Sequence, residues 1–415
     1  MNTLRLRILA VFSYSYFISY VFRGVNLGFA PFLARELGLT ASDLGALTSA
    51  YFLGFAIAQI PAGVLLDRYG PRRVTASVIS FAVVGALIFA SSHNVLGMML
   101  GRLMIGAGVS VCLVGAFKAT AQHFEIAQLP LVNGIVTSTG GIGGVVVGAP
   151  LSLLMTLTDW RTICFSLAGL TALAAAMVLI GAPSDNTGGT RASVAEQFLG
   201  SLNVLRSKTF WKLTSFPGLA QAAFYAMQSL WVGAFLRDVV PAGAGSATRV
   251  GTLVSVLGTS FIVGNIGFGI IARLLNRHGI RTQHFAGSLL LLFIAVQAVI
   301  AARVEVPETL LWAMYGALGS TGFITYAVLP EYYPVNLIGR VNTAYTLVIF
   351  IGVFVVQVAV GNVLGYWPEM QGHHPAVAHQ IVWASLTILQ IFAALWYFAP
   401  AGSSVKRSAS SRFLQ

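Results

Sequence analysis

Long apolar runs separated by short polar breaks recur along the whole chain, and they constrain its fold more than any other feature. A helix needs about 20 apolar residues to cross a bilayer. Hydrophobic residues make up 57% of the 415 residues and charged residues only 9%, against about 25% charged in an average soluble protein. The runs predict an all-α membrane protein with twelve transmembrane helices, at residues 8–32, 44–66, 74–93, 97–121, 131–155, 161–182, 211–236, 249–272, 283–302, 308–330, 341–366 and 378–399.

The basic residues predict how these helices are oriented. With a cytoplasmic N-terminus, 16 of the 24 Lys and Arg residues fall on the cytoplasmic side, four on the opposite side and four within or at the edge of helices. Because basic residues accumulate in cytoplasmic loops, we expect a multi-pass protein of an inner (plasma) membrane with both termini in the cytoplasm. This distribution accounts for the net charge of +12 without a nucleic-acid partner.

The two halves of the chain resemble each other. The loop after the second span, Asp67-Arg68-Tyr69-Gly70-Pro71-Arg72-Arg73, has a counterpart after the eighth, Asn276-Arg277-His278-Gly279-Ile280-Arg281, and Asn133 corresponds to Asn342 at a shift of 209 residues. We therefore predict two six-helix bundles related by a parallel pseudo-twofold repeat, with a substrate site between them. The expected divisions are an N-terminal bundle (1–182), a cytoplasmic linker (183–208), a C-terminal bundle (209–400) and a cytoplasmic tail (401–415).

Two motifs resemble those of a known transporter family. The stretch from Gly63 to Arg73 is similar to the major facilitator superfamily signature G-x-L-x-D-R-x-G-R-R, and Arg102-Leu103-Met104-Ile105-Gly106-Ala107-Gly108 is similar to its fourth-helix motif. The resemblance implies that two bundles rock around a central cavity. It also implies that a contact of Asp67 latches the halves when the protein is open outward. The residues expected to serve gating or the conformational change are Asp67, Arg68, Gly70, Arg72, Arg73, Arg102 and Arg340.

The physical basis of this latch is the charge of Asp67. Its carboxylate is expected to accept hydrogen bonds from the N-terminus of the eleventh helix, or to pair with Arg340. The alternative is a charge cluster that only orients the helices. Arg102 has an alternative too, the packing of the fourth helix against the first.

The first span carries Arg23 near the middle of a run that is otherwise free of charge, Ile8 to Phe32. A guanidinium at that depth costs at least ~2.5 kcal/mol, and none of the twelve carboxylates of the chain is central in a span. The stretch Tyr20-Val21-Phe22-Arg23-Gly24-Val25-Asn26 resembles the first helix of the anion:cation symporter branch, whose arginine binds substrate carboxylate or phosphate. That branch has an acid where this chain has Phe22, so the resemblance does not carry over its proton coupling.

These features predict a site for an anion that comes from outside the protein. Arg23 is the expected ligand, with help from Lys118 and Asn26. The alternative is that the arginine and the lysine are structural and that their long side chains snorkel, placing the charged groups at the membrane interface. Neutral groups of the second half are expected to contact hydroxyl, amide or aromatic parts of a substrate, the alternative being helix–helix contacts. The clearest polar stripe is Gln221, Tyr225 and Gln228, and the candidates chosen are Tyr225, Gln228, Trp231 and Tyr345.

The sequence carries no motif for catalysis. It has no Walker loop, no metal-binding pattern and no nucleophile elbow, so we expect neither an enzyme nor a cofactor or metal. The prediction is a monomeric secondary transporter in the lipid bilayer that moves a small organic anion such as a carboxylate by alternating access. Symport with a proton, exchange for a counter-anion and uniport stay open. The alternatives are a drug or metabolite exporter with a broad apolar cavity, and a membrane sensor that does not transport.

Overall fold

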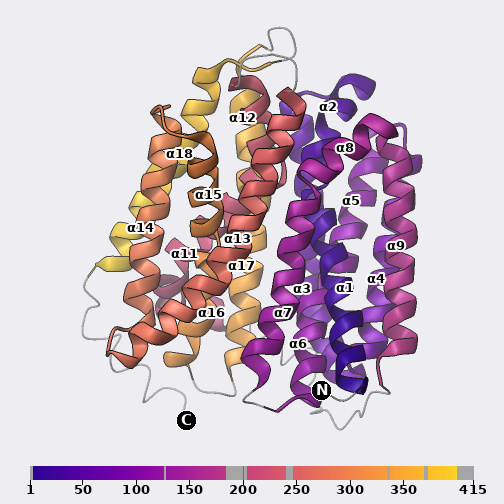
Figure 1. Ribbon diagram of the computed structural model, residues 1–415, viewed down its shortest axis with the longest axis vertical. Helices are drawn as coiled ribbons and strands as arrows, with labels where there is room; N and C mark the ends of the chain where they lie inside the picture. Colours follow the sequence, from indigo (N-terminus) through magenta and orange to yellow (C-terminus); the bar gives the residue numbers. More distant parts are fainter. Residues whose placement is uncertain are drawn as a thin grey trace.

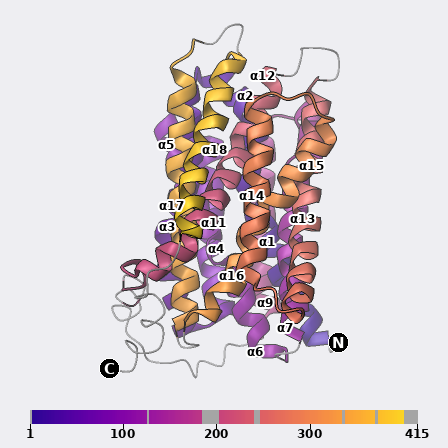
Figure 2. The ribbon, with the colours of Figure 1, turned by 90° about the vertical axis from the view of Figure 1, so that its left-hand side faces the viewer.

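The computed structural model describes residues 3–125, 128–183, 200, 203–239, 246–333, 337–368 and 373–399. The predicted tail, 401–415, and most of the predicted linker, 183–208, lie outside the described residues. Two bundles of helices stand side by side, and each bundle is one half of the chain (Figure 1; Figure 2).

The first half begins with a broken span. Its helices are α1 (Thr3–Gly24), α2 (Asn26–Leu37), α3 (Ala41–Tyr69), α4 (Pro71–Ser91), α5 (Val95–Val109), α6 (Val111–His123), α7 (Leu129–Val146), α8 (Ala149–Leu157) and α9 (Trp160–Gly181). The second half contains α11 (Lys208–Ala226), the π-helix η2 (Met227–Trp231), α12 (Val232–Val239), α13 (Ser246–Arg277), α14 (Thr282–Ala301), α15 (Glu308–Gly319), the 3-10 helix η3 (Thr321–Ile324), α16 (Thr325–Val328), the 3-10 helix η4 (Leu329–Glu331), α17 (Ile338–Gly365) and α18 (Ala376–Phe398).

Every predicted span coincides with a helix or with a set of consecutive short helices. Among the described residues, ten segments are long and apolar enough to cross a membrane, and α7 with α8, bent by 45°, forms an eleventh. The predicted span 308–330 is divided into α15, η3, α16 and η4. The prediction of an all-α membrane protein built from two bundles is therefore confirmed.

The predicted fourth and tenth spans are interrupted at equivalent serines. Ser110 separates α5 from α6, and its Oγ donates to the carbonyl of Ala107 at 2.8 Å. Ser320 follows α15, and its Oγ donates to the carbonyl of Ala317 at 2.7 Å. Hydroxyls that bond back to the helix backbone bend helices, so the repeat extends from the sequence to these breaks.

Glycines bring helix backbones into direct contact within each half. A Cβ on Gly106 would lie 1.9 Å from the carbonyl oxygen of Tyr51, and one on Gly54 would lie 2.0 Å from that of Leu103, so α3 and α5 have no room for a side chain there. The second half repeats this pair 210 residues later with Gly264 and Gly316, between α13 and α15, where the corresponding distances are 2.4 and 2.3 Å. Small residues of this kind allow the close packing that membrane helices need.

Replacing one of these glycines is expected to separate two helices. Gly106→Ala and Gly316→Ala should each cost at least ~1–3 kcal/mol, the usual cost of overpacking, and lower the melting temperature of the purified protein by several degrees. Gly267→Ala is the matched control in α13, because nothing lies within 4 Å of its added Cβ. Alanine favours helix over glycine, so the control should melt at or above the wild-type temperature. A wild-type melting temperature for Gly106→Ala would show that the contact is not tight.

Candidate functional site

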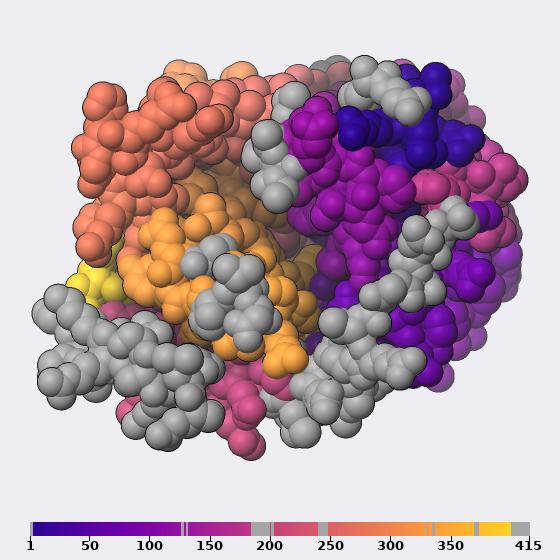
Figure 3. Space-filling view, turned by 90° about the horizontal axis from the view of Figure 1, so that it is seen from below, coloured from indigo at the N-terminus to yellow at the C-terminus, as the bar shows by residue number. Residues whose placement is uncertain are grey.

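A cavity of about 1070 Å³ lies between the two halves. Residues from α1, α3, α6 and α7 line it on one side, and residues from α11, α13, α16 and α17 line it on the other. It opens where α3 and α6 end and α7 and α17 begin, and we call this the open end. Seen from there, the surface is hollowed between the orange helices of the second half and the magenta helices of the first (Figure 3).

Arg23 lies in the last turn of α1 and is the deepest of the α1 residues in the cavity wall. Its side chain is buried, and its Nε and Nη1 have no hydrogen-bond partner among the described residues. The guanidinium carbon instead lies over three aromatic rings: Tyr20 of the first half at 4.5 Å, and Tyr225 and Phe350 of the second half at 4.7 and 5.3 Å. Such contacts stabilise a desolvated cation by up to ~2 kcal/mol each, but they leave the Nε and Nη1 donors without an acceptor.

The break after α1 explains how Arg23 is positioned. Val25, between α1 and α2, still donates to the carbonyl of Val21 at 2.9 Å, whereas the carbonyl of Phe22 accepts a hydrogen bond from Arg102 Nη1 at 3.1 Å. A cation at the C-terminal end of a helix also interacts favourably with the helix dipole. Arg102 is buried, stacks over the ring of Phe89 and does not line the cavity. It therefore fixes the end of α1 that carries Arg23.

At the open end, Asp67 of α3 pairs with Lys118 of α6. Lys118 Nζ lies 2.6 Å from Asp67 Oδ1 and also donates to the carbonyl of Leu66 at 2.7 Å. Arg340 lines the opposite wall of the cavity. The predicted contact of Asp67 with Arg340 belongs to a conformation in which this end is closed, so it stays a prediction.

The other loop residues of the Asp67 motif lie outside the cavity. Gly70 joins α3 to α4 with a φ of 82°, which favours glycine, and Gly279 repeats both the position and the value in the second half. Arg72 Nε donates to the carbonyl of Leu179 in α9 at 2.8 Å, and Arg68 stacks over Tyr69. Arg73, at the start of α4, has a partner as well.

The structure brings together only part of the predicted substrate site. Arg23, Tyr225 and Lys118 line the cavity, whereas four other candidates do not. Asn26 donates to Thr48 Oγ1 at 2.9 Å, and Tyr345 donates to the carbonyl of Gly322 at 3.1 Å. Gln228 and Trp231 are buried in the π-helix η2.

Several polar residues in the cavity wall were not among the predicted ligands. Asn133 and Thr137 line it from α7, and Asn342 and Thr346 line it from α17. In both helices the threonine hydroxyl donates to the carbonyl of the asparagine four residues before it, at 3.0 and 2.9 Å. The 209-residue shift that pairs Asn133 with Asn342 also pairs Thr137 with Thr346. Gln59, Gln221 and Asn265 are the other amide side chains among its lining residues.

The opposite end of the cavity is shut by contacts between the halves, and we call it the closed end. A Cβ on Gly361 of α17 would lie 2.8 Å from the carbonyl oxygen of Ala41 in α3. On the other side, Ser255 of α13 contacts the bend between α7 and α8: its Oγ accepts from the N–H of Ala149 at 2.8 Å and donates to the carbonyl of Val145 at 3.2 Å. The second half thus supplies a partner for backbone that the bend exposes.

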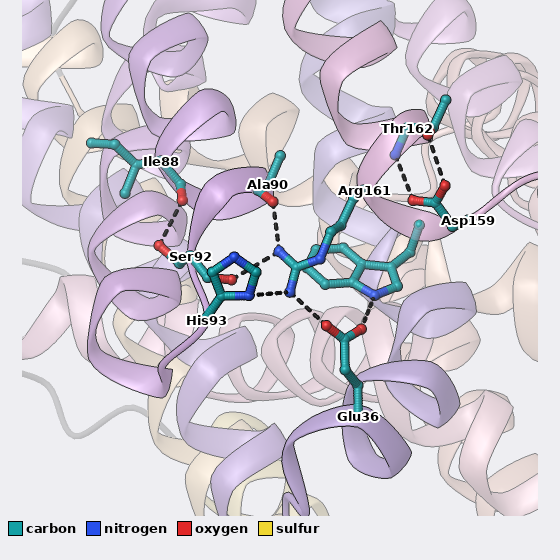
Figure 4. A network of polar contacts seen from close by, with 9 residues as sticks. Glu36, Ile88, Ala90, Ser92, His93, Asp159, Arg161 and Thr162 are labelled. Atoms are coloured by element: carbon teal, nitrogen blue, oxygen red, sulfur yellow. Dashed lines mark hydrogen bonds and ion pairs between the residues drawn. The ribbon is translucent and has the colours of Figure 1, made fainter.

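A charged network holds α2 at the closed end (Figure 4). Glu36 of α2 pairs with Arg161 Nη2 at 2.5 Å and accepts from Trp160 Nε1 at 2.8 Å. Arg161 Nη1 also donates to the carbonyls of Ala90 and Ser92 at the end of α4, at 2.6 and 2.9 Å. The network anchors the second part of the broken first span to α4 and α9.

Comparison with known proteins identifies the class. The family model of the Major Facilitator Superfamily matches residues 12–357. Because this match covers most of the chain, the protein belongs to the Major Facilitator Superfamily and is a multi-pass membrane protein.

Individual relatives are more distant. The chain is 29% identical over 155 residues to the "Probable sulfoacetate transporter SauU" of Cupriavidus necator, covering 37% of this chain and 36% of that protein. It is 31% identical over 129 residues to the "Probable L-galactonate transporter" of Escherichia coli, covering 31% of this chain and 28% of that protein. The chain thus spans about a third of the length of these relatives. The crystal structure of the nucleoside transporter NupG matches 96% of this chain and all of that chain with a TM-score of 0.75 at 16% identity, which shows a shared fold.

The Ser255 contact should stabilise the conformation in which the closed end is shut. Ser255→Ala removes the partner of the part-buried Ala149 N–H, and a donor left unsatisfied between packed helices costs about 1–3 kcal/mol. The ratio of molecules whose closed end is shut to molecules in which that end has opened should therefore fall roughly tenfold. Spin labels can be attached at Leu157→Cys and Val304→Cys, both exposed at the closed end. In Ser255→Ala, a larger fraction of molecules than in wild type should show a long distance between the two labels. Ser288→Ala is the control, since Ser288 bonds only within α14; equal distance distributions for the two variants would contradict the expectation.

Proposed function

We propose that this protein is a secondary transporter that moves a small organic anion of the carboxylate class across an inner membrane by alternating access. The observation that carries the proposal is Arg23. It is a buried cation between the two halves, it lines the cavity, and two of its nitrogens lack a partner within the described part of the chain. A carboxylate would supply the missing acceptors in a bidentate, charge-assisted contact.

The electrostatics of the cavity support an anionic substrate. Three basic side chains line it, Arg23, Lys118 and Arg340, and the acidic side chain among its lining residues, Asp67, is already paired with Lys118. In a low-dielectric site this excess of positive charge attracts anions and repels cations. The relatives named for sulfoacetate and L-galactonate, both organic anions, agree with this class.

The position of Arg23 also supports alternating access. Its guanidinium contacts rings from both halves, so an anion bound there would touch the two bundles that must move relative to each other. With the termini in the cytoplasm, as the basic loops predict, the open end faces the cytoplasm. The closed end then faces outward, and the conformation is the inward-facing one.

Replacing Arg23 tests the proposal. Arg23→Gln should weaken binding of the substrate carboxylate about tenfold to a hundredfold, because it removes a charge-assisted contact. Arg23→Lys should fall between wild type and Arg23→Gln, since an ammonium keeps the charge but not the bidentate geometry. Thermal stabilisation of purified protein across a panel of carboxylates, followed by uptake into proteoliposomes, measures both effects.

The control for this series is Arg249→Gln, an exposed arginine paired with Glu308 away from the cavity. It should bind and transport as wild type does. Unchanged uptake of the substrate by Arg23→Gln would sink the proposal. Export of uncharged compounds that survives this substitution would favour the alternative, an exporter with an apolar cavity.

A further inference from the structure

Two buried carboxamides share the cavity with Arg23. Gln221 of α11 is 2% exposed and Gln59 of α3 is 3% exposed, and both line the cavity. Within the described residues, both amide atoms of Gln221 and the Oε1 of Gln59 have no hydrogen-bond partner. Buried polar groups are nearly always bonded, and because these two side chains line the cavity, a molecule that enters it can supply the partner.

The satisfied glutamines elsewhere in the fold show the contrast. Gln297 of α14 and Gln390 of α18 are fully buried and exchange two amide hydrogen bonds, at 3.0 and 2.9 Å. This pair shows how buried amides can be satisfied by packing, although Gln357 of α17, fully buried and outside the cavity wall, has neither amide atom paired among the described residues. Gln59 and Gln221 come from opposite halves and are not paired in this way.

Both amides lie one helical turn nearer the open end than an aromatic residue at the level of Arg23. Gln221 precedes Tyr225, whose ring lies 4.7 Å from the guanidinium carbon. Gln59 follows Phe55, whose ring stacks at 3.9 Å on Phe350, another ring over Arg23. One turn of four residues is about 6 Å along the axis. The amides therefore form a second level of the site, on the route from Arg23 to the open end.

The chemistry of the unpaired atoms limits what binds at this level. A carboxamide oxygen needs a donor, and a carboxylate offers only acceptors. An ammonium would donate, but it would enter a cavity with three basic side chains and one paired acid. A hydroxyl is neutral and both donates and accepts, so it matches the whole amide of Gln221.

We infer that Gln221 and Gln59 bind hydroxyl groups of the substrate tail, so that the transported anion is a hydroxylated monocarboxylate. The inference rests on the proposed function, because it takes the carboxylate to be bound by Arg23. The carboxylate lies at Arg23, and the hydroxyl-bearing carbons extend about 6 Å toward the open end. A six-carbon polyhydroxy acid has this length.

Binding of two acids of equal length tests the inference on the full-length purified protein. Gluconate carries hydroxyls on its tail and hexanoate carries none. Wild type should bind gluconate at least about tenfold more tightly than hexanoate, because hexanoate has no hydroxyls and leaves the buried amides unpaired. Gln221→Leu and Gln59→Leu should each reduce this preference by weakening gluconate binding, whereas hexanoate, whose apolar tail then meets Leu instead of an unpaired amide, should bind at least as tightly as to wild type. Arg23→Gln should weaken both acids by a similar factor.

The free protein supplies a second measurement. Gln221→Leu replaces an unpaired buried amide with an apolar group, so the unliganded melting temperature should stay the same or rise. Gln297→Leu is the matched control: it strands Gln390, so its melting temperature should fall while the preference for gluconate is retained.

The outcomes separate this inference from the proposed function. Hexanoate or adipate binding that depends on Arg23 and equals gluconate binding would overturn the hydroxyl site and keep the carboxylate site. Failure of every carboxylate to stabilise the protein would overturn both. Sorbitol binding as tight as gluconate binding would overturn the carboxylate site, because it would show recognition without a charge. Wild-type preference for gluconate in Gln221→Leu and Gln59→Leu would remove the assigned role from the amides.

Discussion

The burial of a guanidinium between the two halves is the constraint on which the cavity depends. Arg23 is held by aromatic rings rather than by a carboxylate, and rings stabilise a cation without satisfying its donors. It lies in the last turn of α1, which ends at Gly24. Arg102 bonds the carbonyl of Phe22 there, and the Glu36–Arg161 pair anchors the continuation of the span. Two further arginines thus keep the first one in place.

The fold was largely predictable for two reasons. The thickness of the bilayer sets the length of each apolar run, and the repeat of the two halves is visible in the sequence. The breaks were not, since Ser110 and Ser320 lie within apolar runs and a hydropathy pattern does not register a hydroxyl bonding back to its own helix. The spans also run longer than predicted, as α13 does from Ser246 to Arg277, because polar helix ends continue beyond the apolar core. Hydropathy locates a span but not its true ends.

The part of the site that could be predicted is the residue whose burial in the membrane has a high free-energy cost. Arg23 followed from the expense of a buried charge, and it lines the cavity. Gln228, Trp231 and Tyr345 were chosen as polar or aromatic residues of the second half. In this conformation they lie on helix faces that pack against other parts of the protein and not on the cavity wall. Gln59 was missed because a single amide in an apolar run looks the same whether it faces a cavity or a neighbouring helix. Which face of a helix meets the cavity is decided by packing between elements far apart in the chain.

The bend between α7 and α8 links opening of the closed end to water. Ala149 begins α8, so its N–H has no partner within its own helix, and the hydroxyl that serves it belongs to the other half. When the halves part at that end, the N–H moves from a protein partner to solvent, and water must reach the bend as it opens. Hydration of this one peptide group is therefore part of the energy difference between the two conformations, and dehydrating conditions should favour the one in which it is covered.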